Sequence, residues 1–416
     1  MSKKPKSIIA GVLVLLLIAV PFGWWWQSNA RHGKYKDLIK AFYVIGIVKL
    51  NYYQPVNLGK LVKSYFKTGN IAGMLKTLHD PYTEFLDKAE YAELQKETKG
   101  VFGGIGIYLI PKAGELIISS VVKGSPGEKA GLRQGDRIIQ VNHISVKNLS
   151  SEGAIAHIKG KAGTKVILRI ARGEGSNRTD LDVEIVRSNI VIPTVDMTLT
   201  SDPILGRYAM LKIEQFSETT VDELEKKLKQ LDQMTDCKGL ILDLRGNPGG
   251  LLTAAVNVVS QFLPEGTPVL YVYNKGKLLQ TIVSEYSAHK YLPMIVLIDN
   301  WSASAAEIVS GALKDQKRAV VVGAHSYGKD LIQEVKDLWD GTAVKVTIAN
   351  YLTSGKVNIH KKGVQPDNVV DIPGAMDALL KKGNTEPFIR MKRLQEEEAL
   401  RILREQPLKE IRKKAG

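Results

Sequence analysis

The sequence contains one cysteine, Cys237, among 416 residues, so no disulfide can form within the chain. A lone cysteine neither requires nor excludes an oxidising compartment, and a buried, unreactive thiol is its expected state. The sequence also lacks an HExxH motif and any other clustered set of metal ligands. We therefore expect neither a metal nor any other cofactor.

Motifs for nucleic-acid recognition are missing as well, although the formal net charge is +15. No zinc-ligand spacing and no aromatic and basic RNA signature accompanies this charge. Lysine and arginine are scattered through every segment, which is typical of a solvated surface near anionic lipid. Hydrophobic residues make up 44% and charged residues 24%, as in globular proteins. The length allows two or three domains and no nucleic-acid partner is expected.

A long uncharged run occurs at the N-terminus. The basic segment MSKKPK precedes the apolar residues 8–20 and the tryptophans 24–26, a stretch of roughly 18–20 residues that is long enough to span a bilayer. The lysines should stay cytoplasmic and the tryptophans should lie at the far interface. We expect residues 1–30 to be a single-pass anchor, or else a signal peptide cleaved after residues 28–30. Either one places the rest of the chain on the extracytoplasmic side of the cell membrane.

A predicted strand followed by a predicted helix places Ser304 at a strand-to-helix corner. The apolar run 293–298 indicates a buried strand, and apolar residues then recur at helical spacing over 308–313. A hydroxyl at such a corner can be exposed while the unpaired N–H groups of the helix start point at a developing oxyanion. The residues Ser304 to Glu307 also match a capping box, in which the serine only satisfies the helix start. The serine alone favours this second interpretation.

Lys329 and Gln333 are candidates for the general base of a nucleophilic serine and for the residue that orients this base. Their spacing of four residues places both side chains on one face of a strand and keeps them neighbours on a helix. Lysine acts as a base only when neutral, so its pKa must fall from about 10.4 towards roughly 7–8 through burial. Glutamine can orient the amine without adding a negative charge that would hold the proton on it. The alternative is that Lys329 is a solvated surface charge.

The same segment resembles the active-site signature of the carboxyl-terminal processing proteases, also called tail-specific proteases. The resemblance rests on SASAAEI around Ser304, on YGK ending at Lys329 twenty-five residues later, and on Gln333 four residues further on. It implies that these three residues perform the chemistry of a serine endopeptidase. The family pattern usually has a second serine at the position of Ala306 and a glycine at the position of Asp330.

A glycine-rich turn, DLRGNPGG, covers residues 243–250 after a predicted strand. It lacks the lysine and the hydroxyl of a nucleotide-binding P-loop. In the resembled family this turn gives one backbone N–H to the oxyanion hole, and the residue after the serine gives the other. The resemblance therefore implies Gly249 or Gly250 together with Ala305. The spacing does not decide between the two glycines.

Short β-rich runs broken by glycine, which begin at residue 100, resemble a PDZ domain. VFGGIGIYLI is similar to its carboxylate-binding loop and second strand, and residues 120–146 and 159–172 are similar to its later elements. A glycine-rich hairpin would explain GGIG alone, but three ordered segments favour a PDZ domain over 99–187. In such a loop, successive backbone N–H groups capture the terminal carboxylate of a peptide. These would belong to Phe102, Gly103, Gly104, Ile105 and Gly106.

Strands and helices alternate after residue 187 in a β-α-β rhythm. We expect strands at 208–213, 239–244, 269–273, 294–298, 320–323 and 344–351, and a helix at 220–231. The resemblance implies an α/β protein: a crotonase-like (ClpP-like) α/β spiral core over 188–384 with an inserted PDZ domain. A helical region over 31–98 precedes them, and an amphipathic helix over 385–416 follows. Its apolar stripe, Phe388, Met391, Leu394, Ala399 and Ile402, has no obvious place in its own domain, which suggests dimerisation.

These features predict a membrane-anchored serine endopeptidase that selects protein substrates by apolar C-termini through its PDZ domain. The family resemblance also implies that the PDZ domain gates activity, and an adaptor protein is a further possible partner. The main alternative is a membrane-displayed PDZ scaffold with an inactive core. A crotonase-like acyl-CoA enzyme and a Ser304/His325 pair are less favoured, because neither an adenine-recognition signal nor a carboxylate orienter is evident.

Overall fold

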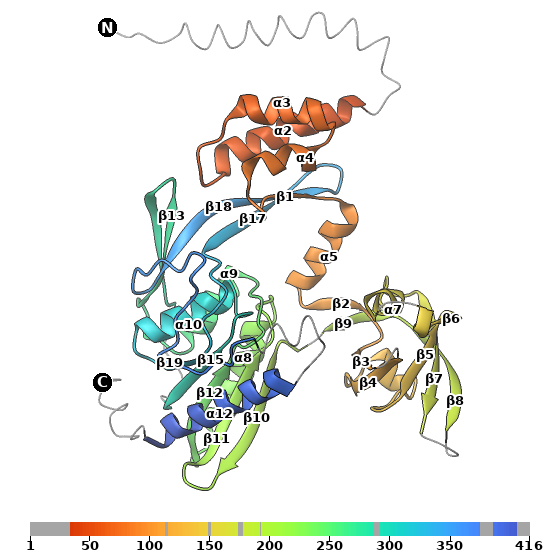
Figure 1. The fold of residues 1–416 in the computed structure, drawn as a ribbon, viewed down its shortest axis with the longest axis vertical. Coiled ribbons are helices and arrows are strands. Elements are labelled where there is room, and N and C mark those ends of the chain that lie inside the picture. Colours follow the sequence, from red (N-terminus) through yellow and green to blue (C-terminus); the bar gives the residue numbers. More distant parts are fainter. Residues whose placement is uncertain are drawn as a thin grey trace, which may run out of the picture. The chain divides into compact units, whose positions relative to one another are not determined.

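The computed structural model describes residues 34–112, 115–148, 151–173, 178–191, 193–285, 292–374 and 386–405 (Figure 1). Contacts divide the chain into two compact units, Met1–Lys88 with Gln333–Ile348, and Ala89–Ile332 with Ala349–Gly416. The expected N-terminal anchor lies outside the described residues. Within the described ranges, no helix combines the length and the apolar character needed to cross a membrane.

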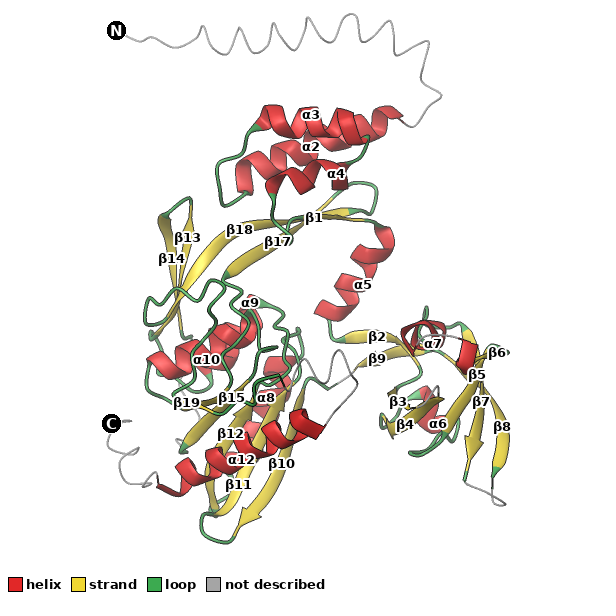
Figure 2. Ribbon diagram, in the orientation of Figure 1, coloured by secondary structure: helices red, strands yellow, loops and turns green. Residues whose placement is uncertain are grey.

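The first unit contains helices that pack on a short strand pair (Figure 2). Its elements are α2 (Lys34–Asn51), α3 (Leu58–Thr68), α4 (Ile71–Leu75), the 3-10 helix η1 (Lys76–Leu78) and β1 (Glu84–Leu86), which pairs antiparallel with the start of β18 (Ala343–Thr353). The sequence predicted helix over 56–78, but Gly69 ends α3 with φ 71° and the Asn70 side chain caps α4. Left-handed backbone of this kind ends helices and favours glycine.

The segment Gln333–Ile348 folds with the N-terminal helices, whereas the sequence-based division assigned it to the protease core. Val344 and Val346 from this segment are buried in one cluster with Val44 and Met74. The Thr347 hydroxyl donates to Asp80 at 2.6 Å. Periodicity assigns a strand but not its partner, so this return of the chain was not predictable.

An ion pair between α2 and the returning segment makes the stability of the first unit depend on pH. The Thr342 hydroxyl and the Lys40 ammonium hold the pKa of Asp340 at about 2, against an ordinary value of 3.8. Because the folded-state pKa is lowered, the stabilisation is complete above pH 3.8 and is lost as the pH falls through 2. We expect Asp340→Asn to lower the urea midpoint above about pH 4 and the difference to shrink below it. A difference that stays constant with pH would contradict this.

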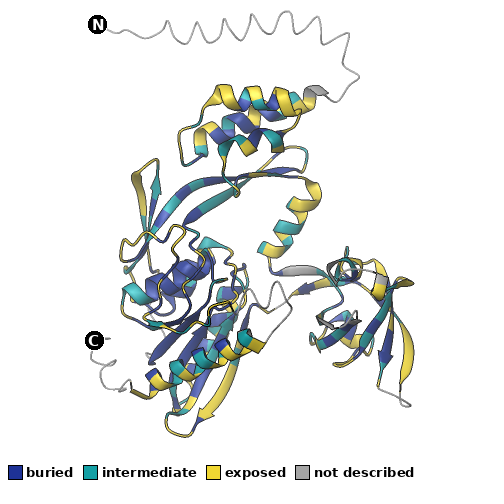
Figure 3. Cartoon of the chain, in the orientation of Figure 1, coloured by how far each residue is buried: buried dark blue, intermediate teal, exposed yellow. Residues whose placement is uncertain are grey.

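The core of the second unit is a six-stranded sheet in the order β10-β11-β12-β15-β16-β19. β10 runs antiparallel to β11, and the following neighbours are parallel. The strands are β10 (Val195–Asp202), β11 (Gly206–Ile213), β12 (Cys237–Asp243), β15 (Met294–Ile298), β16 (Val320–Gly323) and β19 (Asn368–Val369), and the helices among them are α8 (Thr220–Asp232), α9 (Leu252–Ser260) and α10 (Ala305–Asp315). Every residue of β15 is buried, as Figure 3 shows for much of this layer. The predicted β-α-β alternation is confirmed.

The strands β13 (Pro268–Asn274) and β14 (Lys277–Val283) pair with each other, and residues 350–353 of β18 pair with β13. The strand β17 (Leu331–Asp337) pairs with β18. β14 and β17 were not predicted, because neither strand contains a run of fully buried residues, and the signal of such a strand is weak. Cys237 at the start of β12 is buried, as expected.

The C-terminal helix α12 (Glu386–Glu405) packs on the core of its own chain. Met391, Ala399 and Ile402 are buried, and the last two share a cluster with Ile241 and Ile295 of the parallel sheet. The apolar stripe therefore has a place in its own domain. This removes the argument on which the expected dimerisation was based.

A separate six-stranded sheet follows α5 (Lys88–Thr98), in the order β3-β4-β5-β7-β8 with β6 beside β5. Its elements are β3 (Ile107–Lys112), β4 (Glu115–Val121), α6 (Pro126–Lys129), β5 (Arg137–Val141), β6 (Ile144–Ser145), η2 (Val146–Asn148), α7 (Ser151–Ile158), β7 (Lys165–Arg172) and β8 (Thr179–Val186), and β2 (Val101–Gly104) pairs with β9 (Ser188–Val191) beside it. They enclose a core of their own around Ile118, Ile138 and Leu168. The strand β3 lies at the edge of this sheet.

Candidate active site

Ser304 lies at the predicted corner, after β15 and directly before α10, in a strained conformation. Its φ of 53° and ψ of −112° fall where a non-glycine residue is rarely found. Such strain costs about 1–3 kcal/mol and concentrates at functional sites. The Glu307 N–H donates to the Ser304 carbonyl oxygen at 2.9 Å, and the capping box that the sequence indicated at the start of α10 is present.

Glu307 joins the nucleophile corner to the loop that carries Lys329. One oxygen of its fully buried carboxylate accepts the N–H groups of Ser304 and Lys329, both at 2.8 Å. The other accepts the Ser326 hydroxyl at 2.5 Å and the Gly328 N–H at 2.6 Å. Burial raises the pKa of Glu307, and these four donors partly oppose that effect. The capping glutamate of the sequence analysis thus also fixes the base loop, which the sequence did not reveal.

Tyr351 of β18 forms a second bridge between the same two residues. Its hydroxyl lies 3.3 Å from the Ser304 carbonyl oxygen and 3.2 Å from that of Lys329, and can donate to either. The side chain is 1% exposed. Burial, followed by the charges of Glu307 and Asp330, raises the pKa of Tyr351 well above its ordinary value, so the hydroxyl keeps its proton. Glu307 therefore links Ser304 and Lys329 through their N–H groups, and the Tyr351 hydroxyl lies within hydrogen-bond distance of both of their C=O groups.

Removing this hydroxyl is expected to slow turnover with little effect on folding. Tyr351→Phe keeps the buried ring and removes the hydroxyl that lies between the Ser304 and Lys329 carbonyl oxygens, which should lower kcat by about tenfold, since loss of a buried hydrogen bond costs about 1–3 kcal/mol. The measurement is kcat, KM and the melting temperature of each variant. Tyr273→Phe, which removes the hydroxyl of a half-buried tyrosine elsewhere in the chain, is the control. A kcat within twofold of wild type would show that the bridge does not position the site.

The glycine turn lies against the nucleophile corner. A Cβ added to Gly249 would be 2.8 Å from the Ala303 carbonyl oxygen and 2.9 Å from the Ser304 Cβ, and the φ of Gly249 is 104°. Both the close approach and the backbone conformation require glycine there. The Ala303 N–H donates to the Asn247 carbonyl oxygen at 3.0 Å, which attaches the turn to the corner.

The two candidate glycines of the turn differ in their hydrogen bonds. The Gly249 N–H donates to Asn247 Oδ1 at 2.8 Å. In the described part of the chain, no acceptor receives the N–H groups of Gly250 or Ala305. These two are therefore the donors available to an oxyanion.

The other residues that the sequence analysis singled out are Gln333, His325 and Asp330. Gln333 lies in β17 with the first unit, and no described group hydrogen-bonds its buried Nε2. His325 is exposed, and its Nδ1 lies 3.2 Å from the Ser326 carbonyl oxygen rather than beside a carboxylate. Asp330, where the family pattern has glycine, is buried and lies 2.6 Å from His360 Nδ1. Nothing here completes a Ser/His/Asp arrangement at His325.

Comparisons with known proteins identify the family of this chain. Residues 207–370 match the family Peptidase family S41, and residues 117–172 match the PDZ domain. The chain is 36% identical over 349 residues to the carboxy-terminal processing protease CtpA of Bacillus subtilis (strain 168), across 83% of this chain and 72% of that protein. The chain belongs to peptidase family S41. This S41 chain is also 35% identical over 305 residues to the carboxyl-terminal-processing protease of Synechocystis sp., across 73% of this chain and 70% of the relative.

A solved structure supports the same assignment. The photosystem II D1 C-terminal processing protease superposes with a TM-score of 0.54 at 28% identity, across 82% of this chain and 94% of that one. The S41 chain is thus a serine peptidase of the carboxyl-terminal processing type, with a mixed α/β fold and a PDZ domain. The resemblance drawn from the SASAAEI, YGK and Gln333 pattern is confirmed.

The expected carboxylate-binding loop of the PDZ domain is only partly a loop. Phe102, Gly103 and Gly104 belong to β2, while Ile105 and Gly106 lie between β2 and β3. Ile105 is buried in the core of the domain, and Gly106 has a φ of 75°. The N–H groups of these two donate to no acceptor among the described residues. They are the better placed of the five to bind a carboxylate.

Proposed function

We propose that this S41 peptidase uses Ser304 as nucleophile, Lys329 as general base and Gln333 to orient the lysine amine. The observation that carries the proposal is the Glu307 carboxylate, which binds the N–H groups of both Ser304 and Lys329 at 2.8 Å. This buried anion thereby holds the backbone of the nucleophile and the backbone of the base together. Gln333 enters the proposal through the family signature, in which it follows Lys329 by four residues.

The reaction follows from these roles. The Ser304 Oγ attacks the scissile carbonyl carbon while its proton passes to the Lys329 Nζ. The N–H groups of Gly250 and Ala305 stabilise the oxyanion of the tetrahedral intermediate. The C–N bond then breaks, the Lys329 ammonium returns the proton to the leaving amine, and an acyl-enzyme remains. Water activated by the same lysine hydrolyses the ester and regenerates Ser304.

Substrates are proteins or peptides with apolar C-termini, bound by the PDZ domain. The support is the edge position of β3 beside the N–H groups of Ile105 and Gly106. A C-terminal peptide can add a strand to such an edge and place its carboxylate on these groups. Gating by the PDZ domain and an adaptor protein remain predictions, as does dimerisation.

A location at the cell membrane, with the catalytic part on the extracytoplasmic side, rests on the N-terminal sequence. The basic MSKKPK, the uncharged residues 8–20 and the three tryptophans support a single-pass anchor. The crotonase-like form of the core is likewise supported by its parallel strands from β11 to β19.

Blocking the PDZ loop tests how substrate is selected. A Cβ at Gly104 would meet no atom within 4 Å, so the side chain of Gly104→Trp can begin there without a clash, and its bulk would stand next to the loop. The substrate is a protein with an apolar C-terminus, and its cleavage by the full chain in detergent is measured by mass spectrometry. We expect Gly104→Trp to lose most of this cleavage activity. Lys129→Trp, at an exposed position of α6, is the control. Unchanged cleavage by Gly104→Trp would exclude recognition through this loop.

A further inference from the structure

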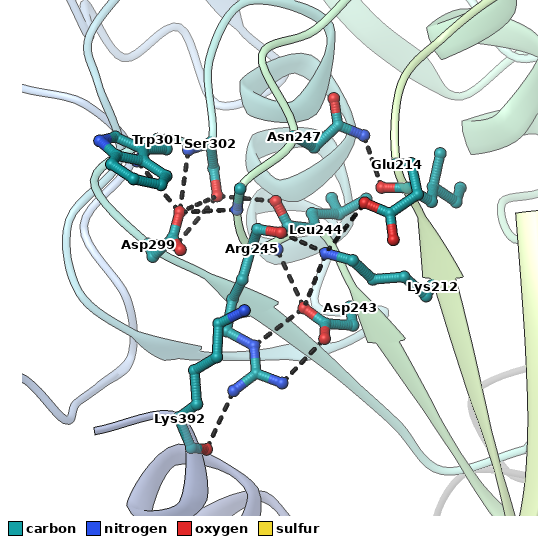
Figure 4. A network of polar contacts seen from close by, with 12 residues as sticks. Lys212, Glu214, Asp243, Leu244, Arg245, Asn247, Asp299, Trp301, Ser302 and Lys392 are labelled. Atoms are coloured by element: carbon teal, nitrogen blue, oxygen red, sulfur yellow. Dashed lines mark hydrogen bonds and ion pairs between the residues drawn. The ribbon is translucent and has the colours of Figure 1, made fainter. Parts of the chain in front are cut away.

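Arg245, which directly precedes the glycines of the oxyanion turn, is a buried charge. Its guanidinium is 2% exposed and forms two parallel bonds with Asp243 at the end of β12, from Nε to Oδ1 at 2.9 Å and from Nη2 to Oδ2 at 2.8 Å. Figure 4 shows this pair with its neighbours. Such a fork geometry fixes the orientation of the arginine.

The other donors of Arg245 go to the C-terminal helix α12. Nη1 donates to the carbonyl oxygen of Lys392 at 2.9 Å, as Figure 4 shows, and to Gln395 Oε1 at 3.3 Å. Nη2 also donates to Glu396 Oε1 at 2.7 Å. All five N–H groups of the guanidinium thus have acceptors, and three of the five bonds reach a helix about 150 residues away in sequence.

The contact between Arg245 and α12 stabilises the ionised form of the arginine. Burial opposes the ionised form of Arg245, but Asp243 and Glu396 outweigh that effect and raise its pKa. Gln395 is fully buried, and its Nε2 donates to the Val370 carbonyl oxygen at 2.9 Å, which fixes the amide for its bond with Arg245. Removing one partner of a buried charge is far more costly than losing an exposed pair.

The backbone of Arg245 and Gly246, at the start of the turn, is also held by hydrogen bonds. The Lys212 ammonium donates to the Arg245 carbonyl oxygen, and the Gly246 N–H donates to Asp299 Oδ1 at 2.9 Å. Gly249 is the fourth residue after Arg245, and a Cβ added to it would meet the Ser304 corner. A shift of the guanidinium therefore moves the start of the segment that presents the Gly250 N–H.

We propose that α12 is a positioning element of the oxyanion turn, acting through the Lys392 carbonyl group, Gln395 and Glu396 on Arg245. This inference rests on the proposed use of the Gly250 N–H. The helix supplies no reacting group. It holds the arginine in the one orientation in which the turn reaches the nucleophile corner, so its loss weakens transition-state binding more than substrate binding.

The test uses neighbouring residues of α12 in the full chain. Glu396→Ala removes one acceptor of Arg245, and Gln395→Met with Glu396→Ala removes two. Glu397→Ala is the matched control, because Glu397 is exposed and lies 3.9 Å from Arg393 rather than at Arg245. Each variant is assayed for kcat, KM and melting temperature against one protein substrate. Ser304→Ala is included to test the proposed nucleophile.

We expect Glu396→Ala to lower kcat by about threefold or more and the double variant by about tenfold or more, with KM within about twofold. Glu397→Ala should match wild type. A folded double variant with kcat within twofold of wild type would overturn the inference. If the double variant does not fold, Glu396→Ala alone decides, and an unchanged kcat overturns the proposal. Full cleavage by Ser304→Ala would instead show that the proposed nucleophile is wrong.

Discussion

Ser304→Ala is expected to abolish peptide cleavage. The alanine keeps the corner between β15 and α10 and the hydrogen bond from its N–H to Glu307, so only the attacking oxygen is lost. Loss of the nucleophile from a serine peptidase lowers kcat by roughly a millionfold. Lys329→Ala should cost nearly as much, because nucleophile and base act as one unit and their separate losses are not additive.

The measurement is initial cleavage rate at saturating substrate. Ser201→Ala, at an exposed position of β10, and Lys336→Ala, in β17, are controls and should cleave at the wild-type rate. Activity retained by Lys329→Ala but lost in Ser304→Ala would assign the base to another group, with His325 the first to be tested. Activity retained by both variants would contradict the Ser304/Lys329 assignment. A substrate left whole by all three proteins, wild type included, would instead favour the PDZ scaffold with an inactive core.

Glu307→Gln is expected to be nearly as damaging, although it changes one atom of a side chain that does not meet the substrate. Each carboxylate oxygen accepts two donors, so either orientation of the amide turns its NH₂ group towards two of them. Each buried donor without an acceptor costs about 1–3 kcal/mol, and the displaced loop carries Lys329. We expect a loss of at least about a hundredfold in kcat, together with a lower melting temperature.

Glu265→Gln, an exposed site after α9, controls for loss of charge and should behave as wild type. Glu307→Asp adds a second comparison, because it keeps the charge but shortens the reach by one methylene group. If Glu307→Gln keeps more than half of the wild-type kcat, the carboxylate does not organise the site.

The sequence was sufficient for those features that depend on local patterns. The uniformly apolar residues of β15 and the helical spacing of α10 predicted a corner at Ser304, and the corner is present with a strained backbone. The signature around Lys329 and Gln333 identified the family. These features are local because strand and helix periods are properties of a few consecutive residues.

Contacts between distant segments were not predictable. Tyr351 lies 47 residues after Ser304, and no spacing rule indicates that its hydroxyl joins that residue to Lys329. Arg245 was noticed only as part of a glycine turn, since nothing in the sequence pairs it with α12. The same stripe of α12 that suggested dimerisation is used within the chain. In each case the partner is selected by the fold and not by periodicity.

The central claim is that Ser304 is the nucleophile and is activated by Lys329. The most direct test is covalent labelling with a serine-reactive phosphonate, followed by tandem mass spectrometry of the modified peptide. We predict a single adduct on Ser304 in the wild-type protein, and labelling slowed by at least about a hundredfold in Lys329→Ala. An adduct on another residue, or equal labelling rates in the two proteins, would contradict the account.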